Sequence, residues 1–112
     1  MSLRESQSLF LDDVVKLHAF AKQEGFEVTG GELQRTLEQQ EIYFRTGKSK
    51  TLDKSYHLKK LAIDLFFFKE GILISSKEEL QSLGDYWESL TLANRWGGNW
   101  TFVDCPHFER RG

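Results

Sequence analysis

The segment from Leu61 to Phe68 is apolar except for one residue, Asp64. A carboxylate that is buried without a partner either destabilises the fold or takes up a proton, and strands disfavour aspartate. A bound cation would offset the cost of holding this charge among apolar side chains. Asp64 is therefore a candidate metal ligand.

Two of the three histidines lie in polar segments beside acidic residues. His57 precedes the Asp64 strand, and His107 follows Asp104 in the stretch DCPHFE. Two imidazoles and one carboxylate suit a zinc ion with an open fourth position, as in catalytic rather than structural sites. The residues from His57 to Asp64 would span roughly 23 Å if fully extended. The chain between His57 and Leu61 must therefore fold back if both side chains bind one ion.

Asp104 is a candidate general base because it lies three residues before His107. Pro106 restricts Cys105 to extended conformations, which stiffens the path between the two residues. If His107 binds the metal, Asp104 can reach the metal-bound water. The alternative is two surface histidines and a carboxylate at a strand end. On composition and spacing alone this alternative is favoured, since chance motif matches are common.

Hydrophobic periodicity predicts an α+β protein whose helices flank a small antiparallel sheet. The Asp64 strand is too apolar to have a wet face, so we expect it at the centre of the sheet. Ser76 is an expected helix N-cap, with Glu79 at the capping-box position. A glycine-broken loop is expected over residues 94–100. The predicted helices are 8–24, 36–47, 77–83 and 86–93, and the predicted strands are 26–29, 61–68, 72–75 and 101–104.

Composition excludes several classes of protein. The 112 residues suggest one domain, and 39% hydrophobic content with nine phenylalanines can fill a core. No stretch is long and apolar enough for a membrane span, and the acidic start of the chain does not fit a signal peptide. A formal net charge of -2 makes nucleic acid a poor partner. The single cysteine, Cys105, excludes an internal disulfide.

Four segments, in order along the chain, resemble the M15 family of zinc peptidases. This family contains D-alanyl-D-alanine carboxypeptidases and phage L-alanyl-D-glutamate endopeptidases. SYHLKKLAID is similar to the family's Ser-x-His-x(6)-Asp signature, and DCPHFE to its Asp-x-x-His-Phe-Glu ending. ANRWGGNW is similar to the Trp-Gly-Gly-x-Trp lead-in of phage members, and ELQRTLEQQEIYFRTGKSKT to the upstream segment. The resemblance implies the small α+β fold shared with the Hedgehog signalling domain.

The resemblance also implies roles for individual residues. His57, Asp64 and His107 match the zinc ligands, and Asp104 matches the catalytic acid/base. Arg35, with Arg45 as its rival, matches an arginine that stabilises the carbonyl oxygen or holds substrate, and Ser55 matches a substrate-contacting serine. Lys60 departs from the family's usual glycine, which affects the expected geometry of the loop after His57.

Other residues near these motifs have two readings each. Trp96 and Trp100 are candidates to line a substrate cleft, although at least one is expected in the aromatic core. Glu109 either holds the second ring nitrogen of His107 or is a surface carboxylate. Cys105 is expected to be a buried bystander that points away from the Asp104 side chain.

The resemblance, together with the candidate ligand set, implies zinc-dependent hydrolysis of peptide bonds in bacterial peptidoglycan stems, and its phage subgroup implies the L-alanyl-D-glutamate bond. The alternatives are a D-alanyl-D-alanine carboxypeptidase or dipeptidase, and a zinc-stabilised binding domain without turnover. We expect one catalytic domain over residues 1–112, acting as a monomer and without a cell-wall-binding module. The phage subgroup implies a lysis enzyme (an endolysin) or a virion component. Such a protein is made in the cytoplasm without a signal peptide and acts on the cell wall after release.

Overall fold

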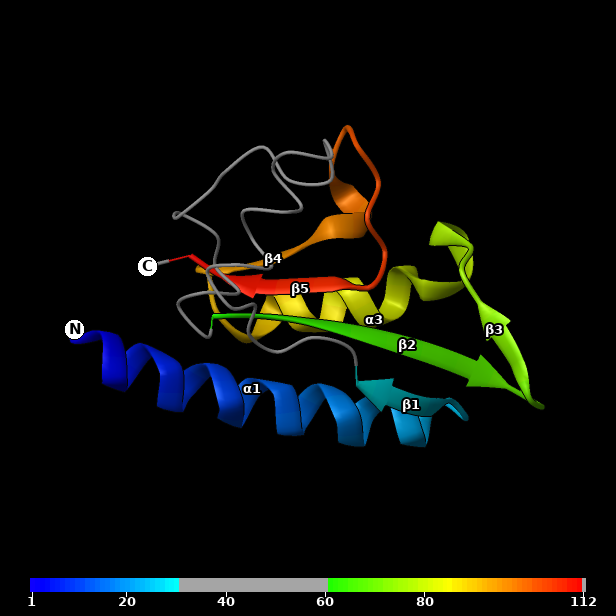
Figure 1. Cartoon of the computed structure of the whole chain (residues 1–112), viewed down its shortest axis with the longest axis horizontal. Coiled ribbons are helices and arrows are strands. Elements are labelled where there is room, and N and C mark those ends of the chain that lie inside the picture. The colour runs from blue at the N-terminus through cyan, green and yellow to red at the C-terminus, as the bar shows by residue number, and fades with distance from the viewer. Residues whose placement is uncertain (31–60, 112) are drawn as a thin grey trace, which may run out of the picture.

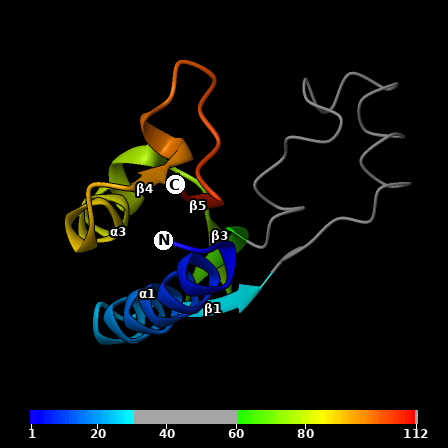
Figure 2. The same cartoon turned by 90° about the vertical axis from the view of Figure 1, so that its left-hand side faces the viewer.

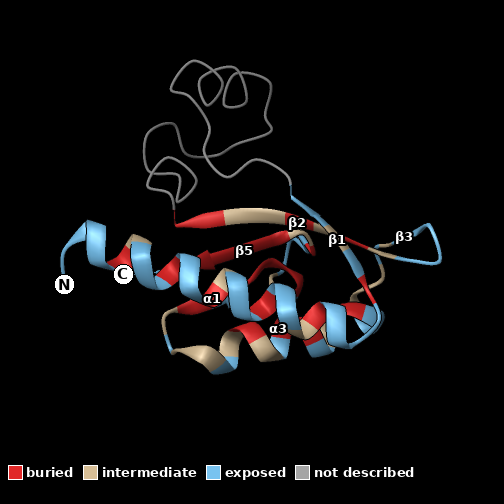
Figure 3. Cartoon of the chain, turned by 90° about the horizontal axis from the view of Figure 1, so that it is seen from below, coloured by how far each residue is buried: buried red, intermediate tan, exposed pale blue. Residues whose placement is uncertain are grey.

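The computed structural model describes residues 1–30 and 61–111 (Figure 1). The described residues form an α+β fold, as the sequence predicts. Both helices lie on one face of the sheet, which Figures 2 and 3 show from two further sides. In chain order the elements are α1 (Leu3–Gln23), β1 (Glu27–Gly30), β2 (Ala62–Lys69), β3 (Ile72–Ile74), α3 (Lys77–Leu90), β4 (Asn94–Trp96), the 3-10 helix η1 (Gly97–Asn99) and β5 (His107–Arg110).

Strand β2 is central in the sheet, as its apolar sequence predicts. The strand order is β1-β2-β5-β4, and every pairing is antiparallel. β5 pairs with the start of β2, where Asp64 lies opposite His107. β3 pairs with the end of β2, after a turn in which Glu70 and Gly71 both have positive φ. The predicted hairpin is therefore confirmed.

The core lies between the sheet and the two helices that cover one of its faces, and β5 is buried along its whole length (Figure 3). Leu65 and Phe67 of β2 belong to this core, as does Phe108 of β5. The Phe108 ring meets those of Phe67 and Trp87 edge to face, at centroid distances of 5.9 and 5.8 Å. Because side chains alternate along a strand, Asp64 and His107 are directed to the opposite face of the sheet from this core.

Helix α1 begins earlier than its periodicity predicts because Ser2 caps it. The Ser2 side chain accepts the Glu5 N–H, and Glu5 accepts the Ser2 N–H in return. This capping box satisfies two backbone donors that a helix start leaves open. Phe10, Leu17 and Ala21 are buried on its inner face. No helix in the described part of the chain is long and apolar enough to cross a membrane.

Helix α3 is continuous, whereas the sequence predicts two helices separated near Gly84. A Cβ at Gly84 would overlap the Trp96 ring, so the glycine permits close packing of β4 on the helix. This contact keeps the helix intact through a residue of low helix propensity. Ser76 caps the helix as predicted, accepting from Glu79 N–H at 3.4 Å. Its hydroxyl donates to Glu78 Oε2.

The predicted strand over residues 101–104 is wrong, and the loop predicted over 94–100 contains β4 and η1. Asp104 N–H donates to the carbonyl of Gly97, and His107 N–H donates to that of Asp104. These bonds fold the segment into a turn, and pairing with β2 starts only at His107. The predicted helix over 36–47 lies outside the described residues.

Candidate active site

Asp64 and His107 lie directly opposite each other on β2 and β5, and their side chains meet. His107 Nδ1 is 3.5 Å from Asp64 Oδ1. This separation is at the outer limit of hydrogen bonding. Two ligands of one tetrahedral zinc ion, each at its usual distance from the metal, would be about 3.4 Å apart. The two side chains therefore fit adjacent corners of a zinc site.

Glu109 holds the other ring nitrogen of His107, as one of its two predicted roles requires. Its Oε1 lies 2.7 Å from His107 Nε2, and its Oε2 accepts from Arg111 Nε at 2.6 Å. His107 and Glu109 share a face because they are two residues apart on a strand. A histidine whose second nitrogen is held by a carboxylate is fixed in orientation and becomes a better ligand. This arrangement leaves Nδ1 for a metal.

When no metal is bound, the side chains of Asp64 and Glu109 stabilise a proton on His107. Burial by itself favours the neutral imidazole, but hydrogen bonds and charges from Asp64 and Glu109 outweigh it and raise the pKa of His107 to about 9. Burial likewise opposes ionisation of Glu109, but His107 and Arg111 outweigh it and lower its pKa. Zinc needs the neutral imidazole, so metal binding must displace this proton.

For metal-free protein we expect stability to fall as pH rises through alkaline values. The pKa of His107 is raised from 6.5 to about 9, so its contribution is complete below pH 6.5 and is lost by about pH 9. Its size is at most roughly 3–4 kcal/mol, since one pKa unit corresponds to about 1.4 kcal/mol. Urea unfolding of chelator-treated protein across this range measures it. In His107→Gln this part of the pH dependence should disappear, and an unchanged slope would show that other groups cause it.

Asp104 is exposed, and the turn that carries it is tied to the Trp-Gly-Gly segment. Its N–H donates to Gly97 O at 2.9 Å, and its carbonyl accepts from His107 N at 3.1 Å. A Cβ at Gly97 would overlap the Asp104 carbonyl oxygen and would lie 3.0 Å from the His107 Cβ. Glycine at position 97 therefore lets two chain segments approach and places Asp104 beside the His107 strand.

Gly97→Ala should reduce both stability and the peptidase activity that the sequence resemblance implies. The added methyl must push the Asp104 turn away, and such overpacking costs about 1–3 kcal/mol. Asp104 is the predicted acid/base, and a displacement of about 1 Å at such a group can lower the rate by about a hundredfold. Gly30→Ala is the matched control, because a Cβ there meets nothing within 4 Å. Urea unfolding and hydrolysis assays compare the two variants, and equal behaviour would refute the role of Gly97.

Trp96 is placed in the core rather than in a cleft. It has 0% exposure, stacks on Phe108, and its indole N–H donates to the Cys105 carbonyl at 2.8 Å. Its ring therefore has no surface to offer a substrate. Trp100, the other candidate, is half-buried and lies 4.9 Å from the His107 ring, centroid to centroid.

Cys105 is buried, with 7% exposure. Burial, with a smaller effect from the charge of Asp104, raises the pKa of its thiol. A protonated thiol is a poor nucleophile and a poor metal ligand.

Sequence reasoning missed Arg111, which binds Glu109. The available signal was its spacing of two residues from Glu109 on an extended segment.

Several predicted site residues lie outside the described ranges: Arg35, its rival Arg45, Ser55, His57 and Lys60. Within residues 1–30 and 61–111, no group of three or more His, Cys, Asp or Glu side chains is arranged to hold a metal ion. The described part of the site thus contains two of the three predicted ligands, Asp64 and His107. The third, His57, stays a prediction.

Comparison with known families adds an independent observation. A sequence profile of an M15 peptidase family, described as D-alanyl-D-alanine carboxypeptidase, matches residues 48–110, which is more than half of the chain. The chain belongs to the M15 peptidase family. The matched range contains Asp64, Asp104 and His107.

The fold of this M15 peptidase is also similar to a solved structure. The crystal structure of the Serratia marcescens L-Ala D-Glu endopeptidase ChiX matches with a TM-score of 0.71 and 25% sequence identity. The match covers 88% of this chain and 78% of the other. A search of curated proteins gave no significant match. The structural likeness supports the α+β peptidase fold predicted from the sequence.

Proposed function

We propose that this M15 peptidase hydrolyses the bond between L-alanine and D-glutamate in bacterial peptidoglycan stems, using zinc. The observation that carries the proposal is the pairing of His107 Nδ1 with Asp64 Oδ1 at 3.5 Å, a separation that suits two ligands of one zinc ion. The bond is chosen because the structurally similar ChiX is an L-Ala D-Glu endopeptidase.

Asp64, His107 and His57 would hold the metal in this proposal. When bound, zinc would lower the pKa of a water molecule and polarise the scissile carbonyl. Glu109 keeps the His107 ring in position through Nε2 at 2.7 Å, and Arg111 in turn holds Glu109. This support acts before substrate arrives, so the ligand geometry is preorganised.

Asp104 moves the protons in the proposed reaction. Its exposed carboxylate takes a proton from the attacking water and then passes it to the leaving amine. Arg35 or Arg45 stabilises the negative charge on the carbonyl oxygen, and Ser55 contacts the substrate. A structural zinc site has no use for such an acid, which argues against a binding domain without turnover.

A D-alanyl-D-alanine carboxypeptidase is the second candidate, because the matching family profile carries that description. A carboxypeptidase needs a cation, best an arginine fork, to seize the terminal carboxylate of its substrate. Arg111 lies near His107, but its Nε is engaged by Glu109. An endopeptidase needs no such cation, since the peptide continues beyond the scissile bond.

The biological setting is also a proposal. The Trp-Gly-Gly-Asn-Trp segment and the aspartate at position 104 resemble phage enzymes. We propose that the protein is a phage or prophage lysis enzyme or a virion component. In this proposal residues 1–112 act as one monomeric catalytic domain on stem peptides.

Digestion of purified peptidoglycan tests the proposal. Zinc-loaded protein should release fragments whose new termini, identified by mass spectrometry, are the L-alanine carboxyl and the D-glutamate amine. Treatment with a chelator should abolish the release, and added zinc should restore it. Release that is unaffected by chelation would contradict the role of zinc. The absence of new termini with a folded, zinc-loaded sample would contradict the proposed substrate.

A further inference from the structure

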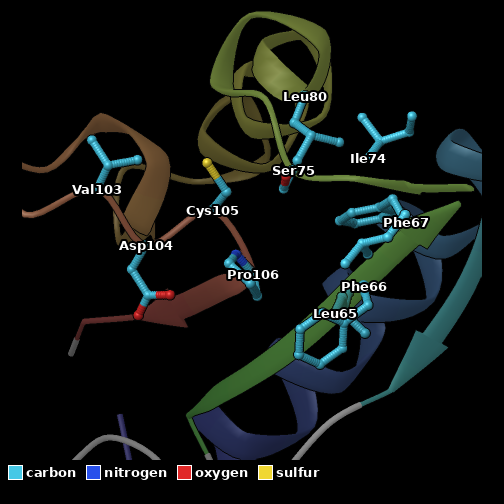
Figure 4. A pocket seen from close by; sticks show the side chains of 11 residues that line it. Leu65, Phe66, Phe67, Ile74, Ser75, Leu80, Val103, Asp104, Cys105 and Pro106 are labelled. Atoms are coloured by element: carbon cyan, nitrogen blue, oxygen red, sulfur yellow. The ribbon is translucent and has the colours of Figure 1, made fainter. Parts of the chain in front are cut away.

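A pocket of about 280 Å³ is lined in part by Asp104 (Figure 4). It lies beside the part of β2 between the residues that pair with β5 and those that pair with β3. β5 pairs with β2 only as far as Asp64, and β3 begins to pair at Phe67. Leu65 and Phe66 line the pocket in this interval, and the turn that contains Val103 and Asp104 forms the facing wall. We call this cavity the side pocket.

The side pocket adjoins the candidate active site. Phe66 lines the side pocket and lies two residues from Asp64 on β2, so its side chain is directed to the same face of the sheet as Asp64. Asp104, the candidate general base, lines the pocket as well. Leu65 N–H donates to the Pro106 carbonyl at 2.8 Å, which joins the two strands at the pocket edge. A substrate whose scissile carbonyl lies at Asp64 and His107 can therefore place an adjoining group in the side pocket.

Apolar side chains form most of the side-pocket wall. Val103 and Leu73, which line the pocket, are 56% and 50% exposed, so their apolar side chains are accessible to a ligand. Among the described lining residues, Asp104 is the one with a charged side chain. An anionic group in the side pocket would be repelled by this carboxylate and would find no cation among these residues.

We propose that the side pocket binds the N-acylated L-alanine side of the substrate, which deepens and rests on the proposed function. The two sides of the scissile bond differ in charge, because D-glutamate carries a carboxylate and acylated L-alanine is uncharged and bears a methyl group. Charge therefore assigns L-alanine to the side pocket. An apolar cavity of about 150 Å³ holds benzene, so the larger side pocket has room for the alanine methyl together with part of the acyl group.

Paired substrates and paired variants test this assignment. Replacing L-alanine by glycine in an acylated stem peptide should lower kcat/KM about fourfold for the unmodified protein, from the loss of one buried methyl group. Ser75→Trp should fill the side pocket and bring this ratio close to one, and Leu73→Ala should reduce it. Ile72→Ala is the matched control, because Ile72 is an exposed neighbour on β3 that does not line the pocket. It should keep the fourfold ratio.

Binding without turnover separates this inference from the proposed function. N-acetyl-L-alanine amide should shift backbone amide NMR signals of residues 65–67 and 103–105 in the zinc-loaded protein, and Ser75→Trp should abolish these shifts. Shifts elsewhere, or a ratio unchanged in folded Ser75→Trp, would overturn the side-pocket assignment even if the L-alanyl-D-glutamate bond is cut. Shifts at these residues without cleavage of stem peptides would retain the pocket and refute the proposed function.

Discussion

Asp104→Asn is expected to lower the rate of stem-peptide hydrolysis by at least about a hundredfold, with zinc content and fold unchanged. Asparagine has the shape of aspartate but cannot accept the proton of the attacking water. The backbone bonds that hold the turn, from Asp104 N to Gly97 O and from His107 N to Asp104 O, do not involve the side chain that changes. The loss should therefore appear in kcat, with little change in stability.

Asp12→Asn is the matched control, since Asp12 is an exposed aspartate on helix α1. It removes the same charge from the protein and should leave hydrolysis unchanged. Steady-state kinetics and metal analysis on both variants complete the comparison. Normal hydrolysis by Asp104→Asn would remove Asp104 from the mechanism. Glu109 would then be the next acid to test, although His107 and Arg111 already engage both of its oxygens.

His107→Ala should abolish tight zinc binding and, with it, activity. Metal analysis of the unmodified protein should find about one zinc per chain, and the variant should retain almost none after dialysis. Asp64→Ala and His57→Ala should also abolish tight zinc binding, because a three-ligand site loses most of its affinity for zinc when any one ligand is removed. His18→Ala, a substitution at an exposed position of α1, is the control.

Glu109→Gln should give an intermediate result. The side chain still reaches His107 Nε2 but no longer carries a charge, and loss of such support weakens metal binding about 10–100-fold. Competition with a coloured chelator measures the affinity of each variant. Full zinc retention by His107→Ala or His57→Ala would refute the ligand set, and equal losses in Glu109→Gln and His107→Ala would make Glu109 itself a ligand candidate.

Much of the fold was predictable because its signals are local. The apolar sequence of β2 on both sides of Asp64 indicates a central strand, and the Glu70-Gly71 turn indicates the hairpin to β3. Ser76 signals the start of α3. The apolar setting of Asp64 made this residue a candidate metal ligand, and the strand register places it opposite His107.

The errors arise where contacts between distant residues decide the structure. Gly84 reads locally as a helix break, yet the Trp96 ring packs against it and α3 continues. Thr101–Asp104 has strand-like residues, but the hydrogen bond to Gly97 makes it part of a turn. Trp96 was a candidate to line a substrate cleft, with the aromatic core as its alternative, and the structure places it on β4 in the core. None of these contacts has a signature in the local sequence.

The most direct test of the central claim is incubation of zinc-loaded protein with an intact, acylated stem peptide that ends in D-alanyl-D-alanine. The peptide contains both candidate bonds, so one mass spectrum of the products distinguishes them. The proposed function predicts an acylated L-alanine fragment and a second fragment with a free D-glutamate amine. Free D-alanine as the main product, with the L-alanyl-D-glutamate bond intact, would contradict it and establish the carboxypeptidase instead.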